Sequence, residues 1–222
     1  MSISACQPVG LWRWLVGSGK TTIARLIPSL IRAGAVQVLI DGVPIEQISI
    51  ARMRASIGYV PQDSFHFSDS LRENIVLGAE DEAADRAAEI ARQATDVEDF
   101  PAGMETVVGE RGVTLSGGQK ERTALARALV RDPQILIPDD ALASVDIHTE
   151  EEILKGLRAV MRERTTILIA HRISTVQHAD HIVVLEDGVV AEEGTHAQLV
   201  ARKGIYADMY KRQHLNEELS EL

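Results

Sequence analysis

The chain has 222 residues, of which 45% are apolar and 25% charged, and this suits one large globular domain or a domain with a subdomain. Its net charge of −10 argues against a protein that binds nucleic acid irrespective of base sequence, because such binding needs a basic surface for the phosphates. A single cysteine, Cys6, excludes an intrachain disulfide and fits a reducing compartment, and no apolar run approaches the ~20 residues that cross a bilayer.

Apolar runs bounded by turn residues alternate with helical patterns, which is typical of an α/β fold with a mostly parallel sheet. In chain order, strands are expected at 36–40, 57–60, 135–137, 166–170 and 182–185. The last of these continues through Asp187-Gly188 into a predicted hairpin with residues 189–191. Helices are expected at 21–31, 80–95, 117–130, 150–161 and 204–219. Residues 63–122 are mainly helical and interrupt the strand series, so we predict that they form an inserted subdomain.

A glycine-rich loop opens the first predicted helix. Its residues are Gly17, Ser18, Gly19, Lys20, Thr21 and Thr22. Glycines let backbone N–H groups turn toward phosphate oxygens, Lys20 supplies a positive charge, and the Thr21 hydroxyl can bind Mg²⁺. The complete motif has a glycine at position 14, where this chain has Trp14, and residues 11–15 lack the pattern of a strand followed by glycine. The loop predicts a phosphate site; the alternative is a glycine-rich turn with a surface lysine.

Two further elements follow this loop. Residues 115–119 read Leu-Ser-Gly-Gly-Gln at the start of a predicted helix, and the apolar run 135–138 ends in Asp139 and Asp140. The order of the three elements resembles the ATP-binding cassette (ABC) ATPases. The resemblance runs from about residue 16 to residue 215 and implies a RecA-like P-loop NTPase core with an inserted helical signature subdomain. The implied division is a core at 1–62 and 123–222 and a subdomain at 63–122.

The resemblance assigns roles to the two aspartates. Asp139 would hold Mg²⁺, directly or through water, and the next residue, usually a glutamate, activates the attacking water. This chain has Asp140 there, one methylene shorter, so we expect slow hydrolysis at its own site. Pro138 is unusual because proline removes a ladder N–H from a strand. The alternative for the acids is a turn that ends a strand.

In this family the LSGGQ segment binds the ATP held by a second subunit, so the resemblance implies a head-to-tail dimer that ATP holds together. The residues implied are Ser116, Gly117, Gly118 and Gln119. Gln62, after Pro61, resembles the Q-loop residue that senses Mg²⁺ and the γ-phosphate; on its own it is also an ordinary loop residue. His171 resembles the switch histidine that contacts the γ-phosphate; the alternative is a packed histidine at a strand end. Residues 141–146 resemble the D-loop, with positions 143 and 144 exchanged and Asp146 as its acid.

Residues 106–112 and 65–75 resemble segments of exporter ATPases, the second being the region that meets the membrane domain. For Phe65, His66 and Phe67 the alternative is core packing of the helical insert. An intact LSGGQ together with Asp140 is similar to the degenerate-site half of a heterodimeric exporter. We expect the first strands of the core, the aromatic residue that stacks on adenine and the transmembrane domain to be missing from an N-terminally truncated chain.

The function implied by the resemblance is an ATP-hydrolysing motor domain of a bacterial multidrug or lipid exporter that uses ATP and Mg²⁺. Its partners would be a second ABC nucleotide-binding domain and the exporter's transmembrane domain, with no nucleic acid, at the cytoplasmic face of the cell membrane. One alternative is a catalytically weak module whose LSGGQ completes a partner's ATP site. Another is an ABC protein that acts on DNA or ribosomes, against which the negative charge and residues 106–112 argue.

Overall fold

The structure is a computed structural model that describes residues 2–3, 10–14, 19–32, 34, 37–79, 83–98, 100–109 and 113–220. The strands are β1 (Ser2–Ile3), β2 (Gly10–Trp14), β3 (Leu39–Ile40), β4 (Val43–Pro44), β5 (Ile57–Val60), β6 (Ile135–Pro138), β7 (Thr165–Ala170), β8 (His181–Glu186) and β9 (Val189–Gly194). The α-helices are α1 (Lys20–Leu26), α2 (Ile50–Ala55), α3 (Leu71–Val76), α4 (Ala84–Ile90), α5 (Gln93–Glu98), α6 (Gly117–Leu129), α7 (Ile147–Met161), α8 (Ile173–Val176), α9 (His196–Arg202) and α10 (Ile205–Ser220), and two short 3₁₀ helices are η1 (Ile45–Gln47) and η3 (Gly103–Glu105).

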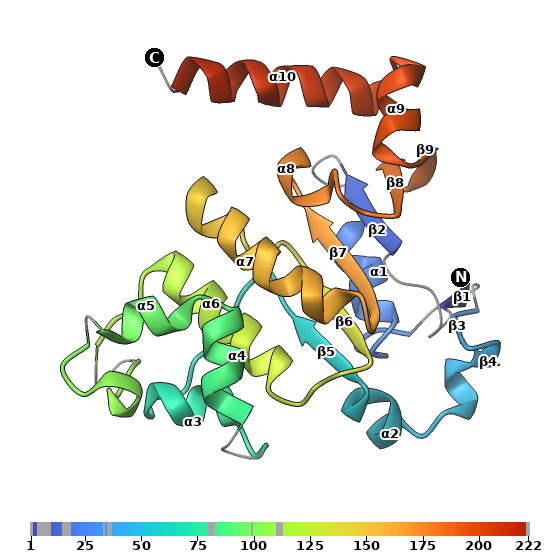
Figure 1. Cartoon of the computed structure of the whole chain (residues 1–222). Coiled ribbons are helices and arrows are strands. Elements are labelled where there is room, and N and C mark those ends of the chain that lie inside the picture. The colour runs from blue at the N-terminus through green and yellow to red at the C-terminus, as the bar shows by residue number, and fades with distance from the viewer. Residues whose placement is uncertain are drawn as a thin grey trace.

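A six-stranded sheet forms the centre of the molecule (Figure 1). Its strand order is β5-β6-β7-β2-β8-β9, and every neighbouring pair is parallel except β8 and β9, which form an antiparallel hairpin. A separate three-stranded sheet has the order β1-β3-β4. The mostly parallel sheet and the hairpin at its edge are therefore as the sequence predicts.

Helices cover both faces of the sheet. Ile135 and Ile137 of β6 pack with Ala24 and Ile27 of α1, whereas Leu136 belongs to the cluster that includes α6 and α7. All four residues of β6 and all six of β7 are buried. Burial on both faces explains why these strands read as continuous apolar runs rather than as alternating patterns.

The expectation that the first strands of the core are missing is wrong for β2. Residues 10–14 form a strand between β7 and β8, with Gly10 opposite Ile167 and Trp14 opposite Leu185. The sequence does not predict this strand, because the charged Arg13 between two tryptophans interrupts the apolar run. Pairing with two long apolar strands overrides weak local preference.

Several helix boundaries also differ from expectation. The segment 80–95 is not one helix, because Arg92 has a left-handed φ of 56° and separates α4 from α5. The first helix ends at Leu26 rather than near residue 31: Ser29, at φ 52°, closes a Schellman turn in which the N–H of Leu30 donates to the Arg25 carbonyl at 2.9 Å. The short helices α2, α3, α8 and α9 have no counterpart among the predicted elements, and the expected strand 36–40 is observed only as β3.

The elements α3, α4, α5 and α6 lie together at one side of the sheet, at the left in Figure 1. The predicted subdomain boundary at residues 122–123 falls inside α6. The chain ends in α10, which extends across the top of the view and packs on α9 and α8. Among the described residues, no helix combines the length and the apolar character that crossing a membrane requires.

Candidate active site

One edge of the six-stranded sheet carries the predicted catalytic residues together with Asp139. Asp139 and Asp140 follow β6, His171 follows β7, and Gln62 lies two residues beyond β5. The carboxyl ends of parallel strands meet at the same edge of a sheet, and a helix that returns across the sheet starts at that edge. The start of α1 therefore comes to the edge that carries the acids and the histidine.

The helix that follows the glycine-rich loop begins at its predicted place. Gly19 is the N-cap of α1 with φ 92°, a conformation that glycine adopts without strain. Thr21 is half-buried and Thr22 is exposed in the first turn. Gly17 and Ser18 lie outside the described residues, as does the side chain of Lys20.

Asp139 lies at the end of β6 with 1% of its surface exposed. Its N–H donates to the Val60 carbonyl at 2.9 Å, and its Oδ2 accepts a hydrogen bond from the Tyr59 hydroxyl at 3.3 Å. Burial and the negative charge of Asp139 raise the pKa of Tyr59, although Arg25 of α1 opposes the rise. The phenol therefore stays protonated and orients a carboxylate close to α1. Tyr59 was missed in the sequence, although its position in β5, next to β6, is the signal that could have identified it.

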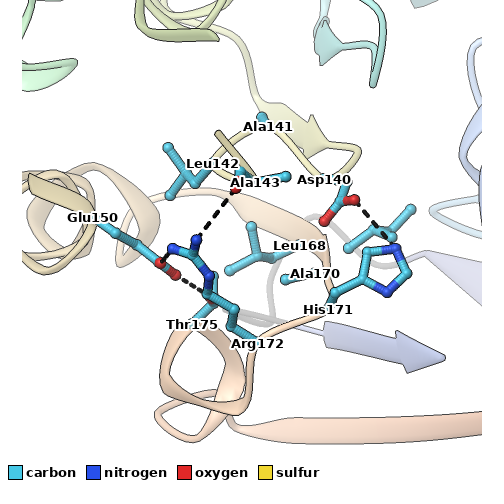
Figure 2. A pocket seen from close by; sticks show the side chains of 11 residues that line it. Asp140, Ala141, Leu142, Ala143, Glu150, Leu168, Ala170, His171, Arg172 and Thr175 are labelled. Atoms are coloured by element: carbon cyan, nitrogen blue, oxygen red, sulfur yellow. Dashed lines mark hydrogen bonds and ion pairs between the residues drawn. The ribbon is translucent and has the colours of Figure 1, made fainter. Parts of the chain in front are cut away.

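Asp140 has a left-handed backbone with φ 55°, a region in which aspartate is more common than most residues. Its N–H donates to the Ile169 carbonyl at 2.8 Å, which ties the residue to β7. The side chain is mostly buried, and its Oδ2 lies 3.2 Å from Nε2 of His171. Figure 2 shows this contact at the end of β7. The structure thus brings a carboxylate and an imidazole together from two neighbouring strands.

The LSGGQ segment forms the start of α6 and caps its N-terminus with a capping box. The Ser116 hydroxyl accepts from the N–H of Gln119 at 3.3 Å, and Oε1 of Gln119 accepts from the N–H of Ser116 at 3.0 Å. Ser116 and Gly117 are exposed, whereas Gly118 is buried. The N-terminus of a helix of this length carries a partial positive charge, so this exposed turn suits an anion.

The start of α6 contacts the loop that follows Asp140. A Cβ on Gly117 would lie 3.1 Å from Cβ of Ser144, and one on Gly118 would lie 3.2 Å from the Ser144 carbonyl. The carboxylate of Glu121, 7% exposed, accepts the N–H of Ser144 at 2.9 and 3.1 Å. The two glycines therefore allow a close approach between the signature turn and residues 141–146. Glu121 was also missed in the sequence, where a charged residue at an apolar helix position was the available signal.

Asp146, the expected acid of the loop 141–146, is the N-cap of α7. Its Oδ1 accepts from the N–H of Thr149 at 2.9 Å, and this hydrogen bond lowers the pKa of Asp146 below its usual range. The helix consequently begins at Ile147, earlier than the predicted start at residue 150. Gln62, in contrast, is exposed and takes no part in the contacts described for Asp139 and Asp140.

The residues at this edge offer oxygen donors to a metal ion rather than a complete cage. Asp139 supplies a carboxylate and Thr21 a hydroxyl, and within the described part of the chain no group of three or more His, Cys, Asp or Glu residues is placed to hold a metal. Mg²⁺ is commonly bound by one or two carboxylates, with waters and substrate phosphates completing its shell. The donor set therefore fits Mg²⁺ brought in with a phosphate ligand.

Comparison with known proteins agrees with this geometry. A family model described as ABC transporter matches residues 15–143. The Bacillus subtilis protein named "Probable multidrug resistance ABC transporter ATP-binding/permease protein YheI" is 46% identical over 202 residues, which are 90% of this chain and 34% of that protein. The solved structure of a bacterial Atm1-family ABC exporter with ATP bound has a TM-score of 0.86 at 44% identity, covering 93% of this chain and 36% of the exporter chain.

The chain thus spans about a third of the length of the relatives that it matches. The matched family region includes the glycine-rich loop, the LSGGQ segment and both aspartates. The TM-score of 0.86 shows that the mostly parallel sheet and its surrounding helices are arranged as in the matching part of that exporter chain. The chain belongs to the ABC transporter family, whose ATP-binding domains are ATPases.

Proposed function

We propose that this chain is the ATP-binding and ATP-hydrolysing domain of an ABC exporter, in which ATP-driven head-to-tail dimerisation is coupled to export of a drug-like or lipid substrate. The observation that carries the proposal is the placement of Asp139, Asp140 and His171 at one sheet edge, with α1, the helix that follows the glycine-rich loop, packed on the same strands β6 and β7. The RecA-like core would comprise residues 1–62 and 123–222, and the helical signature subdomain residues 63–122.

In this proposal Lys20 and the N–H groups of residues 17–22 bind the phosphates of ATP. Thr21, Asp139 and Gln62 would hold Mg²⁺, which when bound offsets negative charge on the phosphates. Asp140 orients the attacking water and accepts its proton as the water oxygen bonds to the γ-phosphorus. The bond from that phosphorus to the bridging oxygen breaks, and ADP and phosphate leave. His171 contacts the γ-phosphate.

The LSGGQ turn would serve a second subunit. Ser116 and Gly117 are exposed at the start of α6, where N–H groups and the helix dipole favour a phosphate. Ser116, Gly118 and Gln119 would therefore bind the γ-phosphate of ATP held by a second nucleotide-binding domain. A composite site of this kind makes ATP part of the dimer interface.

Two exposed aromatic residues support a membrane-domain partner. Phe65 and Phe67 have 68% and 46% of their surfaces exposed, and their rings meet edge-to-face at 5.0 Å. Such exposure excludes core packing as their role and favours contact with another protein surface. We propose that this surface meets the exporter's transmembrane domain, which would place the chain at the cytoplasmic face of the cell membrane.

Substitution of the two half-sites tests the function. Lys20→Ala should abolish ATP binding and hydrolysis, whereas Lys155→Ala, at an exposed position of α7, should change neither. Ser116→Glu should keep ATP binding but block hydrolysis in a partner's site by charge repulsion. If two copies of this chain form the pair, a mixture of the Lys20→Ala and Ser116→Glu chains should recover one active site. Hydrolysis that survives Lys20→Ala would contradict the proposal.

A second candidate is a catalytically weak module whose LSGGQ completes the ATP site of a different partner, as in a heterodimeric exporter. The short Asp140 side chain favours it, as does the complete capping box at Ser116 and Gln119. Single-turnover hydrolysis by the chain alone and with the partner subunit separates the two. Fast hydrolysis only when the partner is present, and only when Ser116 is intact, supports the second candidate.

A further inference from the structure

The loop Ala143–Val145 lies between the Asp140–His171 pair and α6, the helix that begins with the LSGGQ turn. Asp140 lies just before it, and the Asp140 carbonyl accepts the N–H of Ala143 at 3.3 Å. On the other side, the buried carboxylate of Glu121 in α6 accepts the N–H of Ser144. A shift of this short loop would therefore move the residues near Asp140 and the start of the signature helix together.

Arg172 holds the same loop from the side of β7. It directly follows His171, and one of its terminal nitrogens donates to the Val145 carbonyl at 2.9 Å while the other donates to the Ala143 carbonyl at 3.2 Å. The rigid fork of the guanidinium thus spans the loop at both ends. Figure 2 shows Arg172 between Glu150 and Ala143.

A buried carboxylate fixes the guanidinium in this position. Glu150, in the first turns of α7, has 2% of its side chain exposed and forms an ion pair with Arg172. The hydroxyl of Thr175 in α8 donates to the other oxygen of Glu150. A buried carboxylate with both oxygens engaged has little freedom to move, so it keeps Arg172 directed at the loop.

We propose that Arg172, anchored by Glu150, is a positioning residue. It fixes the loop Ala143–Val145 in its place between the Asp140–His171 site and α6, the helix of the LSGGQ turn. This inference rests on the proposed function. It assigns Arg172 an effect on the hydrolysis step rather than on ATP affinity, because its guanidinium bonds are to the loop Ala143–Val145 and to Glu150. The three acceptors are arranged for a planar fork, so a lysine keeps the charge but cannot reproduce the bonds.

Arg164 provides a matched control. It makes the same kinds of bond, donating to the carbonyls of Val160 and Pro133 at 2.7 and 3.0 Å and to Asp132 at 2.9 Å. It lies just before β7 and so at the opposite end of that strand from His171. The test compares the full 222-residue chain with Arg172→Lys, Arg172→Ala and Arg164→Lys. It measures ATP affinity, kcat, KM and hydrogen–deuterium exchange of residues 141–149.

We expect Arg172→Lys to lower kcat by about tenfold to 100-fold, the size of effect that a displacement near 1 Å produces, while ATP affinity and KM change by less than about twofold. Exchange of the 141–149 peptide should become about tenfold faster, as loss of a charge-assisted hydrogen bond predicts. Arg164→Lys should leave kcat within about twofold and leave that peptide unchanged, whereas Arg172→Ala should be at least as impaired as Arg172→Lys.

Full activity in Arg172→Lys overturns the inference, as do equal losses of kcat in Arg172→Lys and Arg164→Lys. A wild-type chain that binds no ATP refutes the proposed function instead. The exchange comparison needs no nucleotide and still decides the positioning role: equal exchange in wild type, Arg172→Lys and Arg164→Lys overturns it.

Discussion

Lengthening the carboxylate at position 140 is the most direct test of how this chain uses its own site. Asp140→Glu adds one methylene, which moves the carboxylate by up to about 1.5 Å, the length of a carbon–carbon bond. In the structure the Asp140 carboxylate lies 3.2 Å from the His171 imidazole on a backbone with φ 55°. The substitution therefore changes both the reach of the group and the strain of the backbone.

We expect the longer side chain to raise the rate of hydrolysis and to lower the stability of the fold. If the short carboxylate limits activation of water, the longer one should raise single-turnover hydrolysis about tenfold to 100-fold, since a displacement near 1 Å has effects of that size. Glutamate is less well suited than aspartate to left-handed backbone, and the penalty for a non-glycine residue there is about 1–2 kcal/mol. For a chain of this size, 1 kcal/mol corresponds to a drop of about 2–4 °C in Tm. Asp140→Glu should thus be faster and less stable.

Rapid-quench single-turnover hydrolysis and calorimetric Tm measure these two effects in the same preparation. Asp140→Asn, which keeps size and removes charge, is the control and should abolish hydrolysis without the loss of Tm. Unchanged rates in both variants would show that Asp140 does not activate water. A slower Asp140→Glu variant would show that its contact with His171, rather than its length, governs the rate.

Three other substitutions test the fold and the site. Gly58→Ala would place a Cβ 2.7 Å from the Ala128 carbonyl, so we expect a loss of about 1–3 kcal/mol in urea unfolding, and wild-type stability would contradict this packing. Ser116→Ala removes the side chain that accepts the N–H of Gln119 and should cost about 1 kcal/mol of stability in the same assay, while the chain's own ATP affinity stays unchanged. Burial beside two cationic side chains lowers the pKa of His66 to about 4, whereas an unfolded histidine titrates near 6.5. As the pH falls, the His66 imidazole therefore takes up its proton in the unfolded chain before it does so in the folded chain, so its contribution to stability is complete above about pH 6.5 and is lost as the pH drops toward 4. We expect His66→Gln to lose less stability than the wild type between about pH 7 and pH 5. Equal losses in the two chains would contradict this.

The sheet was predictable to the extent that its strands carry their own signal. The runs at 57–60, 135–137, 166–170 and 182–185 all appear as strands. Residues 135–137, 166–170 and 182–185 are buried at every position, which favours continuous apolar runs, whereas 57–60 alternates half-buried and buried residues. The segment 10–14 was missed, because its place between β7 and β8 is decided by long-range pairing. The break at Arg92 was missed for a similar reason: α5 has to turn to bring Asp96 to Arg122 of α6, an ion pair at 2.6 Å.

By itself, the sequence determined the kinds of chemical group and their order: the glycine-rich loop, the LSGGQ turn, two acids after a buried strand and a histidine after another. These features are predictable because turns that need glycine and strands that are buried each restrict the residue types at their own positions. Only the tertiary structure decided which groups meet. Asp140 contacts His171, Tyr59 orients Asp139, and Arg172 holds the loop Ala143–Val145, as a result of strand order and helix packing. Such contacts depend on distances between residues far apart in the chain, and hydrogen bonding and packing across the sheet set those distances.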